Sequence, residues 1–294
     1  MQPTYRFPEA IVSTDWLAAH LDDPKVRIFE CTTYLTPPTP GVDAPYTVTS
    51  GRADYDAGHI PGAAFVDLQN ELSDDVVSHL RFTLPPLDEL ARRFAAVGVN
   101  AGHKVVLYSR ASMNWATRVW WMLRAVGFDD AAVLDGGFDK WSLEARPTST
   151  EPRRHPAGQF TARPRPGLFV GRAAVHDAIG DAGICTINAL TPDLHRGENP
   201  RYGRPGRIPG SVNLPAADLV DPKDKSFVTA DVAARHLGAV GAAPGKCHIV
   251  YCGGGIAATL DAFLMHQLGF ENIAVYDDSM SEWARDESLP IETG

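Results

Sequence analysis

The chain has 294 residues, a net charge of −9 and a hydrophobic content of 44%. This length favours two domains, and the composition is that of a globular protein with enough apolar residues for two cores. The acidic balance argues against general nucleic-acid binding, and no apolar run approaches the roughly 20 residues that a membrane helix needs. We therefore expect neither a nucleic-acid partner nor a membrane partner.

The cysteines indicate a reducing compartment. Cys31, Cys185, Cys247 and Cys252 are scattered, without the paired spacing of a zinc site or the pattern of a disulfide framework, so we expect no metal. Cys247 and Cys252 flank one predicted strand at an odd spacing, which directs their side chains to opposite faces and argues against a direct disulfide. Because residues 1–10 lack a basic segment followed by an apolar run, we expect no signal peptide and a cytoplasmic protein.

In chain order, short apolar strands alternate with amphipathic helices. The first half has predicted strands around 27–31, 64–66, 104–108 and 131–134, with helices such as 13–21, capped by Ser13, and 87–97. The second half has predicted strands around 183–188, 211–213, 247–251 and 272–276, and a helix over 257–268. The alternation predicts an α/β fold in which two mostly parallel sheets carry helices on both faces.

Between the halves, residues 146–167 contain five prolines and five arginines and show no apolar periodicity. This composition predicts an extended linker, and its arginines are interpreted as solvated charges rather than a nucleic-acid patch.

The two halves repeat each other. The motif Gly-His-Ile-Pro-Gly-Ala at 58–63 returns as Gly-Arg-Ile-Pro-Gly-Ser at 206–211, and the strand at 104–108 returns at 247–251. Each half then closes with a tryptophan, Trp141 or Trp283. Several motifs in the same order indicate a tandem duplication.

Cys252 is the most informative single residue. It follows the predicted strand 248–251 and precedes three glycines and the predicted helix 257–268. A side chain there lies at the carboxyl end of a strand and at the positive end of a helix dipole, where open α/β sheets place their sites and where the thiolate is favoured. The glycines let successive N–H groups converge on one point. A buried structural cysteine followed by a flexible turn is the alternative interpretation.

The duplicated halves, their shared turn motif and the single cysteine loop resemble the tandem-domain rhodanese-type sulfurtransferases, which include thiosulfate and 3-mercaptopyruvate sulfurtransferases. The resemblance extends from about residue 13 to 290 and implies two similar αβα domains. Ser109 stands where Cys252 stands in the other half. We therefore expect a non-catalytic domain over 1–145, the linker over 146–167 and a catalytic domain over 168–294.

The resemblance implies that Cys252 takes a sulfur atom from a small anionic donor, thiosulfate or 3-mercaptopyruvate, and holds it as a persulfide. Cyanide, a small thiol or a protein dithiol would then accept the sulfur, and no cofactor is needed. Backbone N–H groups at the helix N-terminus would stabilise the anionic sulfur. The residues that we expect to contribute them are Gly253, Gly254, Gly255, Ile256, Ala257 and Ala258. A non-catalytic sulfur-carrier or binding protein of the same fold is the alternative.

Arginines and one histidine are the candidates for donor binding. The family's first substrate arginine falls on Leu194 and the second on Arg201, while Arg196 lies close enough to substitute for the first and Arg204 is nearby. Arginine suits planar anions, so we predict that Arg196 and Arg201 bind the donor, with simple surface charge as the alternative for each. His59 matches a histidine that mercaptopyruvate-type members use near the thiol, although ordering of its turn is an equally simple role.

The loop itself leaves the donor open and excludes other chemistry. Gly254 and Ala257 replace the serine and threonine of mercaptopyruvate-type members, and the basic residues typical of thiosulfate-type members are missing. A cysteine phosphatase needs an arginine at the position of Ala258 to hold the phosphate dianion. A nucleotide-binding P-loop needs Lys followed by Ser or Thr after the glycines, which this chain lacks.

Overall fold

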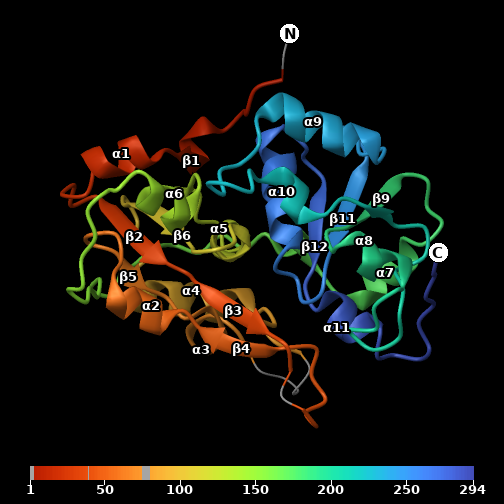
Figure 1. Cartoon of the computed structure of the whole chain (residues 1–294). Helices are drawn as coiled ribbons and strands as arrows, with labels where there is room; N and C mark the ends of the chain where they lie inside the picture. The colour runs from red at the N-terminus through yellow and green to blue at the C-terminus, as the bar shows by residue number, and fades with distance from the viewer. Residues whose placement is uncertain (1–2, 39, 75–79) are drawn as a thin grey trace.

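The computed structural model describes residues 3–38, 40–74 and 80–294, and it contains two five-stranded sheets that are parallel throughout (Figure 1). The first sheet, in spatial order, contains β1 (Ile11–Val12), β7 (Ala131–Leu134), β6 (Lys104–Tyr108), β2 (Val26–Glu30) and β5 (Ala64–Phe65). The second contains β8 (Phe169–Val170), β12 (Ile273–Tyr276), β11 (Cys247–Tyr251), β9 (Ile184–Asn188) and β10 (Val212–Asn213). The order is the same in both, which confirms two similar α/β domains.

Helices connect the strands and cover both faces of each sheet. The first half contains α1 (Thr14–Ala19), α2 (Arg52–Ala57), α3 (Leu68–Glu71), α4 (Leu87–Val97), α5 (Asn114–Ala125) and α6 (Gly137–Leu143). The second half contains α7 (Arg172–Asp177), α8 (Pro192–Arg196), α9 (Ala230–Ala239), α10 (Ala258–Gln267) and α11 (Ser279–Trp283). Short 3-10 turns, η1 (Pro8–Ala10), η2 (Pro166–Leu168) and η3 (Ala216–Leu219), complete the connections. In the residues that the structure describes, no helix is long and apolar enough to cross a membrane.

Strand β6 shows why helices lie on both sides of the first sheet. Its side chains alternate in direction, so that Val105 and Leu107 join one apolar cluster and Val106 and Tyr108 join another. The first cluster includes residues of α4 and α5, and the second includes residues of α1 and α6. An interior strand with apolar residues on both faces requires cover on both faces. The predicted cap of α1 is present, since the Ser13 hydroxyl accepts the N–H of Trp16 at 3.0 Å.

An antiparallel hairpin of β3 (Thr33–Thr36) and β4 (Thr47–Ser50) follows β2. The second half, which the structure describes throughout residues 168–294, has no hairpin at the equivalent place. Figure 1 shows this hairpin projecting from the first half toward α11 of the second. At its tip, the two oxygens of the Asp43 carboxylate accept hydrogen bonds from the two terminal nitrogens of Arg285, each at 2.8 Å. An element of the first half therefore contacts the second.

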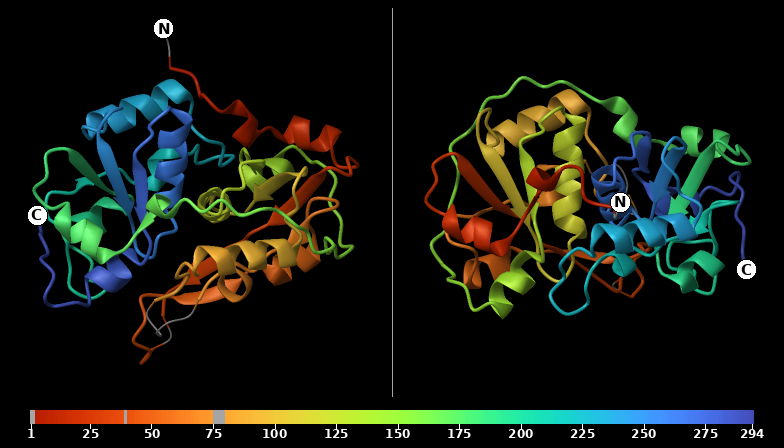
Figure 2. Two further views of the ribbon diagram at one scale, coloured as in Figure 1. Left: turned by 180° about the vertical axis from the view of Figure 1, so that it is seen from behind. Right: turned by 90° about the horizontal axis from the view of Figure 1, so that it is seen from above.

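Residues 146–167 lie against the first half along most of their length, as the right-hand view of Figure 2 illustrates. The segment exchanges two backbone hydrogen bonds between Ser149 and His59, and further along the N–H of Gly158 reaches the carbonyl of Ala95 at 2.8 Å. Near its end, Arg163 donates its N–H to the Val126 carbonyl at 2.9 Å. The segment is extended, as its prolines predict, but backbone contacts anchor it.

The two halves meet through α5 and α10, the equivalent helices of the repeat. The Thr117 and Thr259 hydroxyls lie 3.0 Å apart across this contact, and the rings of Trp120 and Phe263 pack edge to face at 4.7 Å. The N-terminal segment also crosses between the halves, since the N–H of Arg6 donates to the Gln267 carbonyl at 2.7 Å. Apolar packing and hydrogen bonds together join the halves.

A fully buried arginine, Arg118 of α5, lies at the centre of this interface. Its guanidinium donates to the Asp277 carboxylate at 2.6 Å, to the Phe82 carbonyl at 2.8 Å and to the Gly255 carbonyl at 3.1 Å. The other carboxylate oxygen of Asp277 accepts the N–H of Leu84 at 2.6 Å. One ion pair thus joins the first half to the strand and loop that follow the predicted reactive cysteine.

We expect Arg118→Met to lower the free energy of unfolding by about 3–5 kcal/mol, because it removes the fully buried member of the ion pair and leaves the Asp277 carboxylate, which is only 12% exposed, without its partner. The measurement is the urea midpoint at neutral pH, with the slope checked for a single transition. Arg235→Ala is the control, because Arg235 pairs with Asp231 on an exposed helix surface and such pairs contribute less than about 1 kcal/mol. Equal effects of the two substitutions would contradict the role given to Arg118.

Candidate active site

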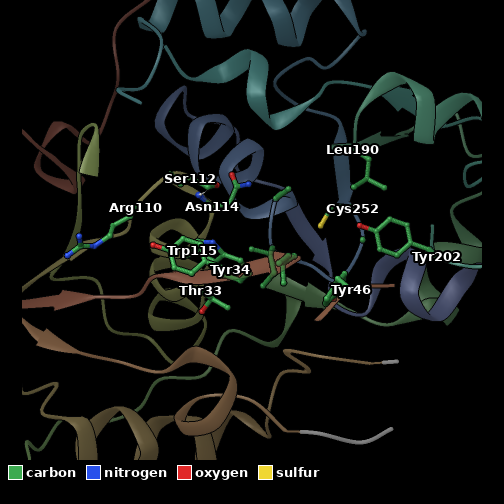
Figure 3. Close-up of a pocket in the computed structure, with 16 residues that line it drawn as sticks. Thr33, Tyr34, Tyr46, Arg110, Ser112, Asn114, Trp115, Leu190, Tyr202 and Cys252 are labelled. Atoms are coloured by element: carbon green, nitrogen blue, oxygen red, sulfur yellow. Dashed lines mark hydrogen bonds between the residues drawn. The ribbon is translucent and has the colours of Figure 1, made fainter. Parts of the chain in front are cut away.

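Cys252 directly follows β11 and borders a pocket of about 270 Å³ between the two halves (Figure 3). Its side chain is only 2% exposed, so a donor must enter the pocket to reach the sulfur. The first half contributes the hairpin, the loop after β6 and the start of α5, and the second contributes the loop after β11. The lining residues are Thr33, Tyr34, Leu35, Tyr46, Arg110, Ala111, Ser112, Asn114, Trp115, Leu190, Tyr202, Cys252, Gly253, Gly254, Ile256 and Ala257.

Ser279, the first residue of α11, holds the cysteine loop (residues 252–257) in place. Its hydroxyl oxygen accepts the N–H groups of Cys252 and Gly255 at 3.0 and 3.1 Å, and it donates to the Tyr276 carbonyl at 2.7 Å. The N–H of Ser281 adds a bond to the Gly253 carbonyl at 2.8 Å. Ser279 itself has a φ of +50°, a conformation that costs energy for a residue with a side chain. The loop is therefore fixed from behind, on the side away from the pocket.

The loop presents several N–H groups to the pocket. Within the described residues, the N–H groups of Gly253, Gly254, Ile256 and Ala257 donate no hydrogen bond, and all four residues line the pocket. Helix α10 begins directly after them, so its positive end lies behind the same space. Unpaired N–H groups at a helix N-terminus form a site for an anion.

Two of the six residues that were predicted to direct their N–H groups into the pocket do not do so. Gly255 and Ala258 are not among the residues that line the pocket. The N–H of Gly255 is already donated to Ser279, and Ala258 is fully buried as the first residue of α10. Gly255 instead shapes the loop, because its φ of +68° lies in the left-handed region.

The glycines also permit close packing. An added Cβ would lie 2.2 Å from the Asp277 carbonyl oxygen at Gly255, and 2.0 Å from the hydroxyl oxygen of Tyr202 at Gly253. At Gly254 it would lie 2.9 Å from the hydroxyl oxygen of Tyr46. The loop is thus tightly enclosed, which argues against the interpretation of a flexible turn.

Two buried tyrosines, Tyr46 from the first half and Tyr202 from the second, flank the cysteine loop. Burial raises the pKa of Tyr46 to about 12 and holds the pKa of Tyr202 above its ordinary range. The neighbouring Cys252 shifts both pKa values in the same direction, while Arg201 opposes the shift. Both phenols therefore remain protonated at neutral pH and are available as hydrogen-bond donors.

Neither of the two arginines predicted to bind the donor lines the pocket, but Arg201 lies beside two tyrosines that do. Arg201 is exposed at its edge, with its guanidinium 5.9 Å from the ring centre of Tyr46 and 5.8 Å from that of Tyr202. Its Nε donates to the Pro45 carbonyl at 3.4 Å. Arg196 does not line the pocket, and its guanidinium is paired with Glu198 at 2.7 and 2.9 Å on the exposed surface. The role of Arg196 in donor binding therefore stays a prediction, and its placement favours Arg201 over it.

His59 is also placed away from the pocket. The ring is fully buried and stacks on Tyr55 with ring centres 3.8 Å apart. Its two nitrogens lie 2.8 Å from the Tyr55 carbonyl oxygen and 3.0 Å from that of Glu151. His59 therefore does not line the pocket in this structure, and these contacts support the alternative role, ordering of its own turn. Arg204, the weakest candidate, donates to four carbonyl groups of the segment 283–289.

The equivalent loop of the first half is closed by an ion pair. Arg110, directly after Ser109, donates to the buried Glu30 carboxylate at 2.6 and 3.1 Å and also to the Gly58 carbonyl. Its guanidinium lies 3.6 Å from the ring centre of Phe138. Although Arg110 lines the pocket, Glu30 neutralises its charge. Among the residues described, no group of three His, Cys, Asp or Glu side chains is placed to hold a metal ion.

Sequence reasoning missed the aromatic residues of the site. Tyr46 belongs to the hairpin. The only sign of this hairpin in the sequence is a longer segment between the start of the strand and the repeated Gly-x-Ile-Pro-Gly turn, 32 residues from Val26 to Gly58 against 22 from Ile184 to Gly206. Tyr202 directly follows Arg201 and could have been considered with it. Trp115 lies just beyond the loop that aligns with the cysteine loop. No pattern within the chain indicates that these side chains meet.

We expect Gly255→Ala to lower the free energy of unfolding by at least about 2 kcal/mol and to abolish activity, since a side chain there is strained and overlaps a carbonyl. The measurement is the urea midpoint together with the rate of sulfur transfer. Gly238→Ala is the matched control: nothing lies within 4 Å of its added Cβ, and alanine within a helix stabilises by roughly 0.5–1 kcal/mol. A fully active Gly255→Ala protein would contradict the close packing described.

Comparison with known proteins agrees with this geometry. The rhodanese-like domain family matches residues 13–144 and 194–286. The chain is 31% identical to a 3-mercaptopyruvate sulfurtransferase of Escherichia coli, covering 96% of this chain and 97% of that protein, and 30% identical to the sulfur carrier protein TtuD of Thermus thermophilus, covering 99% of both.

Solved structures give the same result. The crystal structure of the 3-mercaptopyruvate enzyme SseA from Escherichia coli superposes with a TM-score of 0.79 at 28% identity, covering 92% of this chain and 98% of that one. The shared fold, the two matched regions and the similarity over nearly the full length lead to one conclusion. The chain belongs to the rhodanese-like domain family.

Proposed function

We propose that this protein is a sulfurtransferase that carries a sulfur atom as a persulfide on Cys252. The observation that carries the proposal is a buried thiol in a pocket lined by four backbone N–H groups, those of Gly253, Gly254, Ile256 and Ala257, which have no partner within the part of the chain that the structure describes. This arrangement suits an anionic sulfur atom, because backbone dipoles stabilise the charge without a charged side chain. The sulfurtransferases among its relatives, which include a thiosulfate sulfurtransferase of Corynebacterium glutamicum, support the same activity.

In the first half-reaction, the Cys252 thiolate attacks the outer sulfur of the donor. With thiosulfate, an S–S bond forms to Cys252, the original S–S bond breaks, and its electron pair leaves with sulfite. With 3-mercaptopyruvate, the C–S bond breaks and the carbon that loses sulfur takes up a proton to give pyruvate. In both cases the persulfide sulfur lies in the pocket beside the N–H groups of the cysteine loop.

In the second half-reaction, cyanide, a small thiol or a protein dithiol attacks the outer sulfur of the persulfide. A bond forms between the acceptor and that sulfur, the S–S bond to Cys252 breaks, and the thiolate is regenerated. Donor and acceptor therefore use the pocket in turn, and ping-pong kinetics should follow. The reaction needs neither a metal nor a cofactor.

We assign different roles to the two halves. Residues 168–294 form the catalytic domain. Residues 1–145 form a non-catalytic domain, in which Ser109 replaces the reactive cysteine, and residues 146–167 connect the two. The first half contributes pocket residues from its hairpin and from the start of α5, so its role is to close the site at the interface. Four free cysteines suit a reducing cytoplasm, which would also keep Cys252 reduced.

A sulfur-carrier role is the second candidate, favoured by the similarity to the sulfur carrier protein TtuD. The two candidates share the persulfide and differ in turnover. A carrier delivers its sulfur once to a specific protein, whereas a transferase releases it to a small acceptor over many cycles. Product formed per mole of protein with excess donor and cyanide separates them.

We expect Cys252→Ser to abolish persulfide formation and sulfur transfer, because a serine hydroxyl cannot form the S–S bond. Intact-protein mass spectrometry after incubation with thiosulfate or 3-mercaptopyruvate should show one added sulfur in the wild type and none in the variant. Cys247→Ser is the control, since Cys247 is the exposed cysteine. Equal sulfur incorporation by wild type and Cys252→Ser would refute the proposal.

We expect Arg201→Ala to raise the KM for the preferred donor several-fold with a smaller change in kcat, because Arg201 supplies positive charge at the pocket edge. Arg196→Ala should leave both constants unchanged, since its guanidinium pairs with Glu198 away from the pocket. Steady-state kinetics with thiosulfate and 3-mercaptopyruvate in parallel test both statements. If Arg196→Ala alone raised KM, the assignment of Arg201 would be wrong.

A further inference from the structure

Two phenol hydroxyls, one from each half, flank the sulfur of Cys252, and the reaction outlined above gives them no role. Figure 3 shows Tyr202 with its hydroxyl pointing toward the Cys252 sulfur and Tyr46 approaching from below the same loop. Both tyrosines line the pocket and both are more than 90% buried. The Tyr46 hydroxyl already interacts with the Ser281 side chain, which lowers the pKa of the phenol and therefore leaves the phenol proton free to be donated.

Tyr202 is held against the loop backbone. Its hydroxyl oxygen would lie 2.0 Å from a Cβ at Gly253, so glycine is required for the phenol to approach this closely. Within the described residues, no hydrogen bond contributes to the pKa shift of this phenol, which comes from burial and from the neighbouring Arg201, Cys252 and Tyr46. Its donor capacity is therefore available to whatever occupies the space beside the sulfur.

Tyr46 reaches the same space from the first half. Its hydroxyl oxygen would lie 2.9 Å from a Cβ at Gly254, and the buried Ser281 hydroxyl lies beyond it. The residues before it are attached to the second half by the fork between Asp43 and Arg285 and by the Pro45 carbonyl, which accepts from Arg201. The hairpin thus carries a phenol to a site whose thiol belongs to the other half.

We propose that Tyr46 and Tyr202 are catalytic residues whose hydroxyls donate hydrogen bonds to the sulfur atom in transfer. An S–S bond is about 2 Å long, so the outer sulfur of a Cys252 persulfide extends from Sγ into the space that the two phenols border. The inference rests on the proposed function, because it needs a persulfide on Cys252. It assigns to each half one side chain that contacts the reacting atom.

The chemistry requires hydrogen bonding and no proton transfer. When cyanide attacks the persulfide, a C–S bond forms, the S–S bond breaks, and the electron pair returns to Cys252. When the thiolate attacks thiosulfate, the electron pair leaves with sulfite. In both steps the sulfur being transferred bears negative charge, and donors already in place stabilise that charge. Because the phenols stay protonated, they supply this stabilisation without changing the proton balance.

The test uses the full-length protein with Tyr46→Phe, Tyr202→Phe and the double substitution, which keep the rings and remove the hydroxyls. Tyr55→Phe is the control, since the Tyr55 hydroxyl donates to the Ala63 carbonyl at 2.7 Å inside the first half. We expect each single substitution at the site to lower kcat with thiosulfate and cyanide by about tenfold or more. For comparison, loss of one oxyanion donor in other enzymes lowers kcat by roughly 10²–10³-fold. The donor KM and the shape of the pH profile should stay those of the wild type.

The ion pair at the hairpin tip gives a second, independent measurement. Asp43→Asn weakens the fork to Arg285 without altering the pocket surface, so we expect it to lower kcat less than Tyr46→Phe does. Combined with Tyr46→Phe, it should have no further effect, because its action passes through the Tyr46 hydroxyl. Additive effects of the two substitutions would show that Asp43 does not position Tyr46.

The order of measurements separates the two proposals. Mass spectrometry of the wild type after thiosulfate comes first, and absence of an added sulfur on Cys252 would refute the proposed function itself. If the wild type takes up sulfur and both phenylalanine variants react within twofold of it, the inference about the phenols is overturned and the proposed function stands. A large fall in kcat for Tyr55→Phe as well would also overturn it, since loss of any buried hydroxyl would then suffice.

Discussion

The buried Arg118 guanidinium is the interaction on which the arrangement of this protein depends. An arginine with no solvent exposure must have its charge compensated by the protein, because the uncompensated charge would be too costly. Arg118 meets this requirement with the Asp277 carboxylate and with the carbonyls of Phe82 and Gly255. These partners belong to both halves and include the cysteine loop itself. The same contacts that join the halves therefore hold the loop against Ser279 and keep its remaining N–H groups directed into the pocket.

The site divides its chemistry between the halves. The second half contributes the thiol, the backbone N–H groups and the dipole of α10, while the first contributes walls and a phenol at the end of its hairpin. Positive side chains play a small part, since Glu30 neutralises Arg110 and Arg201 stays at the edge. An anionic sulfur atom would be stabilised mainly by fixed dipoles. Such groups require no reorganisation during the reaction, which suits a charge that moves between donor, sulfur and acceptor.

The difference between prediction and structure follows the range of the interactions involved. The interior strands β6 and β11 and the helix α4 coincide with their predicted ranges, because apolar periodicity records burial within a few residues. The two-residue strands β1 and β8 are too short to show any period, and the hairpin has no counterpart in the repeat. His59 was placed in the site by motif position, and Arg196 by its closeness in sequence to a motif position. Motif position does not determine side-chain direction, and local partners, the Tyr55 ring and the Glu198 carboxylate, hold both residues elsewhere.

The sequence by itself determined the α/β class, the duplication and the position of a lone thiol after a parallel strand, since periodicity and the strand–glycine–helix order are properties of neighbouring residues. Only the tertiary structure decided which N–H groups of the described residues remain unpaired, which arginine lies beside the tyrosines of the pocket and which aromatic residues enclose the sulfur. Ser279 removes the N–H of Gly255 from the predicted set, and Tyr46 joins Cys252 from the other half of the chain. Contacts between residues so distant in sequence arise from the packing of two domains, and no local pattern encodes them.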